Sequence, residues 1–390
     1  MNDPANGQLI IDSEAGPADI AQDARAAAHA IRLARRKTAL LQVTRAILAL
    51  IVALIVGGIV ILLLGRDPLT FYANIIRAGA LHGWQDSVIR MAVMVPMGMG
   101  LVVALRGGIW NIGGDGQFLL AAFMVAGIGP PLMEALPTGW ALIILSLVAI
   151  VVGGSWTILP AYLRASFGLN EIITTVMMSF IGIYVANMLV KGPFKNPMTN
   201  KPKTADMPFD KLLPKIPGTI IPISIFVALA AVIGVYYFFA RTSTGMKLRV
   251  MGANFGAAGH FGLNRRKLVM GCFFASGSLI GLAAAMDILG IWGTMWAGYN
   301  PGYGFPMFAF VFLARLNPLG VVPLAGFYAV LTVGGDTAAR KADLPNDFIL
   351  LLVGLILIVM TGSELIGMGQ AGRRNLAEKL RHALKLRRQP

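Results

Sequence analysis

The sequence predicts an all-α integral membrane protein with about ten transmembrane helices, some of them broken or re-entrant. Of its 390 residues, 56% are hydrophobic and only 13% are charged, and the mean hydropathy is +0.72. Soluble domains carry about 25% charged residues, so the composition favours a membrane protein. Apolar runs recur along the chain, and a glycine-rich stretch with Asn111, Asp115 and Gln117 separates two of them.

The first apolar run, Ala46–Gly65, is long enough to span a bilayer. No small-residue cleavage motif follows it, so we do not interpret it as a signal peptide. Basic residues tend to stay on the cytoplasmic side of the first span. Residues 1–40 are therefore expected to form a cytoplasmic N-terminal tail. The basic residues that flank the start of the run are Arg35, Arg36, Lys37 and Arg45.

Nine further apolar runs follow, and several are shorter than the ~20 residues of a straight spanning helix. Broken or re-entrant helices are therefore expected. Ten spans would place both termini in the cytoplasm, with the transmembrane domain over 41–366 and a basic cytoplasmic tail over 367–390. The nine runs are Met91–Leu105, Phe118–Gly129, Ala141–Leu163, Ile172–Val190, Ile221–Ala240, Leu268–Leu289, Phe305–Leu316, Val321–Val333 and Phe348–Ile366.

The charges of the connecting segments indicate their sides. Residues 241–267 carry six basic residues and no acid, which favours the cytoplasm. Residues 192–220 mix lysines with aspartates and are expected on the periplasmic side. The number of spans also places 336–346 and a loop at 130–139 on that side.

Several function classes are excluded or disfavoured by the sequence. The net charge of +15 lies in loops and tails between apolar runs, so it does not indicate nucleic-acid binding. The four histidines are scattered and Cys272 is the only cysteine, so no metal or cofactor site is expected in this chain. No Gly-x-x-x-x-Gly-Lys-Ser/Thr motif is present, so ATP would have to be hydrolysed by another subunit.

Polar residues inside the apolar region are the candidates for a substrate pathway. A buried carboxylate costs roughly 2.5–3.5 kcal/mol on insertion scales and marks a functional site by default. Asn111, Asp115 and Gln117 could contact a substrate, or they could hold the broken helix through hydrogen bonds. Asp287 could face the pathway, or it could lie in water at the outer end of its helix.

The helix expected over 268–289 carries two further patterns. Gly277, Gly281 and Ala285 are spaced by four, which allows membrane helices to pack closely. A group of aromatic residues follows. A nucleobase could stack on such rings, although an interfacial aromatic belt would explain them without a substrate. The aromatic residues are Trp292, Trp296, Tyr299, Tyr303 and Phe305.

Four segments resemble the permease subunits of ABC importers, in the family that includes the ribose, branched-chain amino acid and general nucleoside systems. Together they are most similar to the nucleoside branch, although Asp115 stands where that branch usually has Glu and Phe255 where Pro is common. The segments are Gly108-Ile-Trp-Asn-Ile-Gly-Gly-Asp-Gly-Gln117; Gly168-Leu-Asn-Glu-Ile-Ile-Thr-Thr-Val-Met-Met178 with Gly192–Pro197 and Thr204–Pro208; Thr244–Arg249 through Gly252-Ala-Asn254 to Asn264; and Pro301–Phe305 through Asn317–Gly320.

The resemblance implies a subunit of the bacterial inner membrane that forms half of a two-permease pore. Its partners would be a second permease, cytoplasmic ABC ATPase subunits that hold ATP and magnesium, and a periplasmic binding protein that delivers a nucleoside. The alternatives are a simple sugar as cargo or, in a different class, an ion-coupled secondary transporter. Membrane lipid is a further expected contact, because leucines alternate with basic residues near the C-terminus.

The resemblance also implies that the loop at 241–267 contacts the ATPase. A short Gly- and Ala-rich helix at 253–261 could sit in a groove of that partner, and the alternative is an ordinary cytoplasmic loop. The residues assigned to this contact are Arg249, Gly252, Asn254, Ala257, Ala258 and Gly262.

Overall fold

The structure, a computed structural model, describes Leu48 and residues 51–260, 262–345, 348–355, 358–359 and 362. The chain divides into two units, 1–55 with 362–390, and 56–361. The second unit contains almost all of the described residues. The tails expected at 1–40 and 367–390 lie outside them.

Seven helices in the described part are long and apolar enough to cross a membrane, which confirms an all-α, multipass protein. The predicted count of ten is not confirmed by these residues. Ile51–Leu63 and α12 (Gly304–Leu313) are shorter apolar helices, and part of the run at 348–366 is not described. The seven are α3 (Trp84–Arg106), α4 (Gly114–Ala135), α5 (Thr138–Trp156) continued by α6 (Ile158–Phe167), α7 (Glu171–Lys191), α8 (Ser224–Arg241), α11 (Arg265–Asp287) continued by η3 (Ile288–Trp292), and α13 (Pro318–Lys341).

Three helices extend well beyond their apolar runs, and one of them is α13, whose run at 321–333 continues to Lys341 and so includes the first residues of the expected loop at 336–346. The run at 91–105 lies in α3, which begins at Trp84 and includes Asp86 and Arg90. The run at 118–129 lies in α4, which continues through Pro130 and Pro131 to Ala135. The expected loop at 130–139 is therefore wrong, since only Leu136 and Pro137 separate α4 from α5.

Helix α3 is the most enclosed of the seven membrane-length helices in the described part. In the most apolar stretch of α3, 83% of the residues are buried. Helix α11 packs closely on α5, because a Cβ on Gly277 would lie 2.3 Å from the Gly153 carbonyl oxygen and one on Gly281 2.0 Å from that of Ala149. Only glycine fits at these two crossings.

Helix α12 begins beside the middle of α3. The Cα of Gly304 lies 3.8 Å from the Cβ position of Gly114, which is 3.6 Å from Met97. The turn after α12 reaches the C-terminal end of α3, where the Arg106 Nε donates to the Leu316 carbonyl oxygen at 2.9 Å. Residues 293–303 therefore descend from the end of η3 to the middle of the bundle, and α12 completes the crossing.

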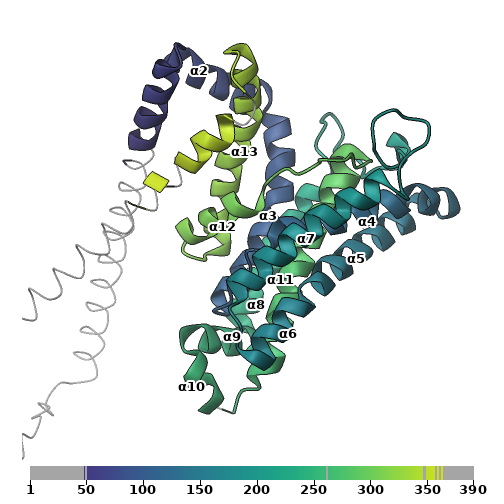
Figure 1. Ribbon diagram of the computed structural model, residues 1–390, viewed down its shortest axis with the longest axis vertical. Coiled ribbons are helices and arrows are strands. Elements are labelled where there is room, and N and C mark those ends of the chain that lie inside the picture. Colours follow the sequence, from purple (N-terminus) through teal and green to yellow (C-terminus); the bar gives the residue numbers. More distant parts are fainter. Residues whose placement is uncertain are drawn as a thin grey trace, which may run out of the picture. The chain divides into compact units, whose positions relative to one another are not determined.

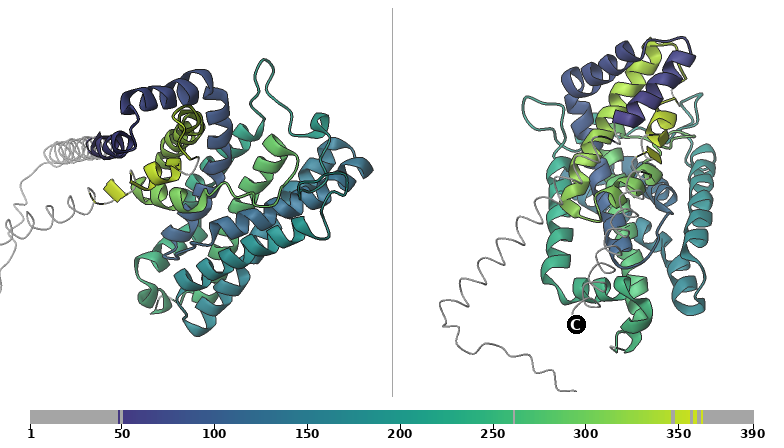
Figure 2. Two further views of the ribbon diagram at one scale, coloured as in Figure 1. Left: turned by 45° about the horizontal axis from the view of Figure 1, so that its top comes forward. Right: turned by 90° about the vertical axis from the view of Figure 1, so that its left-hand side faces the viewer.

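The connecting segments lie at two opposite ends of the bundle. Figures 1 and 2 show α9 (Ser243–Ala253) and α10 (Phe255–His260) at one end and α2 (Pro68–Ile75) at the other. We call these the α9–α10 end and the α2 end. Residues 192–223 lie at the α2 end, where Lys211 donates to the Met133 carbonyl oxygen at 2.7 Å, close to the end of α4.

Candidate functional site

The stretch between α3 and α4 is a non-helical break whose polar groups bond to one another. Asn111 and Gln117 exchange two amide hydrogen bonds, at 2.8 and 3.1 Å. Asn111 also donates to the Ser276 hydroxyl on α11 at 3.0 Å. Irregular backbone survives at membrane depth only when protein or a cavity satisfies it. Both side chains are buried, and their bonds hold the break against α11.

Asp115 caps the helix that begins inside the bundle. It is buried, and its Oδ1 accepts a hydrogen bond from the Gly304 backbone N–H at 2.7 Å. A carboxylate is stabilised at the N-terminus of a helix by the helix dipole. The structure thus places Asp115 under the first turn of α12, next to the residue that follows Tyr303.

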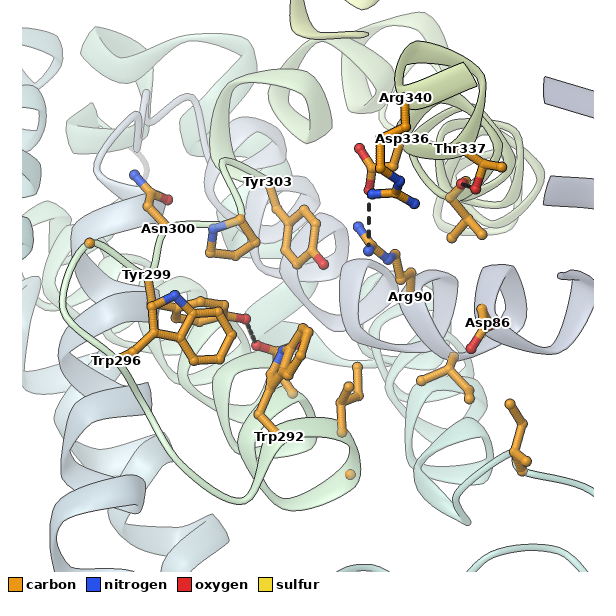
Figure 3. Close-up of a pocket in the computed structure, with 18 of the residues that line it drawn as sticks. Asp86, Arg90, Trp292, Trp296, Tyr299, Asn300, Tyr303, Asp336, Thr337 and Arg340 are labelled. Atoms are coloured by element: carbon orange, nitrogen blue, oxygen red, sulfur yellow. Dashed lines mark hydrogen bonds and ion pairs between the residues drawn. The ribbon is translucent and has the colours of Figure 1, made fainter. Parts of the chain in front are cut away.

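A cavity of about 890 Å³ opens at the α2 end, between α3, η3, the descending segment 293–303 and α13. Its lining includes Lys215 and Ile220 from the 192–223 segment. Figure 3 shows the labelled side chains arranged as two walls, one aromatic and one charged.

The aromatic wall consists of Trp292, Trp296, Tyr299 and Tyr303. The Trp296 ring lies 4.9 Å from that of Trp292 and 4.6 Å from that of Tyr299, centroid to centroid, in edge-to-face contacts. Trp292 and Trp296 retain accessible surface, whereas Tyr299 and Tyr303 are buried. Phe305, predicted with them, is exposed elsewhere.

The charged wall consists of Asp86, Arg90, Asp336 and Arg340. An ion pair joins Arg90 to Asp336 at 3.5 Å, and both side chains are about one third exposed (Figure 3). The wall joins the first turns of α3 to the last turns of α13. It therefore offers both donors and acceptors to a polar solute.

Asp287 also lines the cavity and is fully buried. Its Oδ2 accepts a hydrogen bond from the Tyr299 hydroxyl (Figure 3). The other carboxylate oxygen, Oδ1, has no hydrogen-bond partner among the described residues.

The structure does not bring all four pathway candidates together. Asp287 lies at the cavity with four of the five predicted aromatic residues, whereas Asn111, Asp115 and Gln117 lie deeper, around the break. The charged wall was not singled out from the sequence. Its members stand at the edges of apolar runs, where a charge is expected in water, and only their shared place in the fold identifies them.

At the α9–α10 end, the loop assigned to the ATPase contact forms two helices. The helix expected at 253–261 is shorter, since α10 spans Phe255–His260 and Ala253 ends α9. Ala258 is fully buried, so it is not a free contact surface. Arg249 and Asn254 are exposed, and Gly262 adopts a positive φ of 69° in the turn that follows. The side chain of Ala257 lies outside the described part.

Gly252 connects this loop to the break. A Cβ at Gly252 would lie 2.2 Å from the Arg106 carbonyl oxygen and 2.9 Å from the Gly108 nitrogen. The Arg106 guanidinium lies over the Phe239 ring at 4.9 Å. Helix α9 therefore rests directly on the start of the break at 107–113, which carries Asn111 and leads into the first turn of α4 with Asp115.

Comparison with known proteins gives the family. A family model described as "Branched-chain amino acid transport system / permease component" matches residues 85–361. The glucose ABC transporter permease protein TsgB13 of Haloferax volcanii is 30% identical, over 82% of this chain and 87% of that protein. The guanosine ABC transporter permease protein NupP of Bacillus subtilis is 24% identical, over 82% and 93%.

A third relative, the probable riboflavin import permease protein RfuC of Treponema pallidum, is 25% identical over 82% of this chain and 85% of that protein. No solved structure matches the chain. The match over 85–361, on a bundle with seven membrane-length helices, shows that this chain belongs to the branched-chain amino acid transport system permease family and is the permease component of an ABC transporter.

Proposed function

We propose that this permease forms half of the translocation pathway for a nucleoside in the inner membrane of a bacterium. A periplasmic binding protein delivers the cargo, a second permease completes the pore, and separate ATPase subunits with ATP and magnesium drive transport. The observation that carries the proposal is the cavity at the α2 end. The buried residues Tyr303 and Asp115 lie between this cavity and the α9–α10 end.

The bundle also has a proposed orientation in the membrane. The α2 end faces the periplasm and receives the cargo, and the α9–α10 end faces the cytoplasm. Both termini are then cytoplasmic and the chain has about ten spans, with tails at 1–40 and 367–390 on either side of a permease domain at 41–366. The six basic residues of 241–267 support this orientation.

The α9–α10 end is the proposed ATPase contact. Its exposed residues include Arg249, Asn254, Gly256 and Gly259, so a partner can reach α10 without disturbing Ala258. A displacement of α9 would be transmitted to the break through the contact of Gly252 with Arg106 and Gly108.

The relatives are named for guanosine, riboflavin and glucose, so a simple sugar is the second candidate cargo. The two-walled cavity favours a nucleoside, which has a flat base for the aromatic wall and hydroxyl groups for the charged wall. A sugar is favoured by the 30% identity to the glucose permease.

Uptake of labelled nucleosides and of labelled glucose tests the proposal. The chain would be expressed with its ATPase subunits, second permease and binding protein in a strain that lacks its own uptake of these solutes. We expect ATP-dependent nucleoside uptake that disappears when the ATPase subunit is omitted. Uptake of glucose alone would assign the sugar, and uptake without the ATPase would contradict the proposed mechanism.

A further inference from the structure

We propose that Asp287 and the aromatic wall read the base of the cargo. A base would stack on Trp292 and Trp296, and Asp287 Oδ1 would accept a hydrogen bond from a ring N–H at the edge of that base. The inference rests on the proposed nucleoside function, and it identifies the chemical group that the site selects: a planar heterocycle that carries an N–H donor.

The Asp287 carboxylate holds an unpaired oxygen in a buried place. Buried polar atoms nearly always have a hydrogen-bond partner, yet Asp287 is fully buried and its Oδ1 has none among the described residues. The Tyr299 hydroxyl already occupies Oδ2. In its ionised form the carboxyl group only accepts hydrogen bonds, so the group that pairs with Oδ1 in that form is a donor.

The aromatic rings line the same cavity as Asp287. The Tyr299 hydroxyl donates to Asp287, and the Trp292 ring lies beside that of Tyr299 (Figure 3). Trp292 and Trp296 meet edge to face, with 84° between their planes, and both retain accessible surface. A flat ring that stacks on one of these indoles therefore points its edge, and not its face, toward the other side chains of the cavity. An acceptor among those side chains meets the N–H groups of the ring edge.

The charged wall lies opposite the rings. Arg90, Asp336 and Arg340 offer donors and acceptors about one side of the same cavity. The hydroxyl groups of a ribose would find partners there while the base lies on the aromatic wall. In this arrangement Asp287 recognises the base and the charged wall binds the sugar.

Inosine and purine riboside test the reading directly, because they share the ribose and the purine shape, but only inosine has a ring N–H on its base. The measurement is the ratio of their initial uptake rates at subsaturating concentration, in cells that express the complete transporter. We expect wild type to prefer inosine and Asp287→Asn to lower that preference about tenfold, since a neutral amide oxygen accepts a hydrogen bond more weakly than a carboxylate oxygen does. The binding protein is the same in all strains, so its own selectivity cancels.

Asp210→Asn is the matched control, because it removes an exposed aspartate at the same end of the molecule but outside the cavity. It should leave the ratio unchanged. Asp336→Asn, on the charged wall, should lower the uptake of both nucleosides alike. An unchanged ratio in Asp287→Asn relative to wild type would overturn the inference.

Tyr299→Phe gives a second test in case Asp287→Asn fails to insert. It keeps the ring and the carboxylate but frees Oδ2, so the preference for inosine should be at least as large as in wild type, and its loss would contradict the inference. Failure of the proposed function looks different: wild type and all variants would then take up neither nucleoside while transporting glucose.

Discussion

Asp115 fixes a helix that begins inside the protein. Its Oδ1 accepts from the Gly304 N–H at 2.7 Å, and a Cβ on Gly304 would lie 2.7 Å from the same oxygen. The Asp115 carboxylate can therefore occupy this position only because residue 304 is a glycine. Because the start of α12 lies directly below Tyr303, this one contact also sets the floor of the cavity.

The first prediction concerns this pair. Asp115→Ala leaves a buried N–H unpaired and should destabilise the protein by about 1–3 kcal/mol, whereas Asp115→Asn keeps an acceptor and should lose less. Gly304→Ala places a methyl group against the carboxylate and should also destabilise. The double variant should lose less than the sum, because the shorter side chain at 115 makes room for the new Cβ. Thermal unfolding of the purified protein in detergent measures each effect, and simple additivity would contradict the direct contact.

At the scale of elements, apolar runs located the helices better than they located their ends. The runs at 141–163, 172–190, 221–240 and 268–289 overlap the spans formed by α5–α6, α7, α8 and α11–η3. Helix α3 begins seven residues before its run because Asp86 and Arg90 face a cavity that the chain itself builds. The same reason explains why the charged wall was missed, since its residues lie on helices far apart in the sequence.

The second prediction concerns the crossing of α5 and α11. Gly281→Ala would press a Cβ on the Ala149 carbonyl oxygen, so it should destabilise the protein by about 1–3 kcal/mol. Gly271→Ala, in the same helix, meets nothing within 4 Å and should stabilise it by about 0.5–1 kcal/mol through helix propensity. Melting temperatures of the two variants should therefore move in opposite directions. A similar shift for both would mean that α11 does not pack on α5 as described.

The third prediction concerns α10. Gly256 is exposed and a side chain there approaches only Asn254, at 3.4 Å. Gly256→Arg should leave the permease inserted and paired with its sister subunit, but it should lose the ATPase on purification, and uptake with it. Ala258→Arg, at a buried position, should instead disrupt α10 itself and lower the amount of folded protein.

Met198→Arg is the control for that test, because it adds the same charge at an exposed position in the 192–223 segment. It should retain the ATPase at the wild-type ratio. Retention of the ATPase and of full uptake by Gly256→Arg would show that α10 is not the contact.

At the scale of the whole second unit, a segment that mixes basic and acidic residues and a segment with basic residues only lie at opposite ends. Residues 192–223 and the last turn of α13 are at the α2 end, and the basic stretch 241–267 is at the α9–α10 end (Figures 1 and 2). The sequence predicted the same grouping from charge and from the number of spans. The number of spans could not predict that one end of the bundle holds a cavity and that the other end carries the proposed coupling surface.

The last prediction is the side of the membrane that each end faces. Cys272 is buried and its Sγ contacts the Val103 carbonyl oxygen at 3.4 Å, so Cys272→Ser should fold and gives a background without reactive thiols. In that background Lys201→Cys and Asp343→Cys, both at exposed positions of the α2 end, should react in intact cells with a thiol reagent that cannot cross the membrane. Lys247→Cys, exposed on α9, should react only after the cells are permeabilised. Labelling of Lys247→Cys but not Lys201→Cys in intact cells would reverse the orientation, and the cavity would then open to the cytoplasm, where no periplasmic binding protein could fill it.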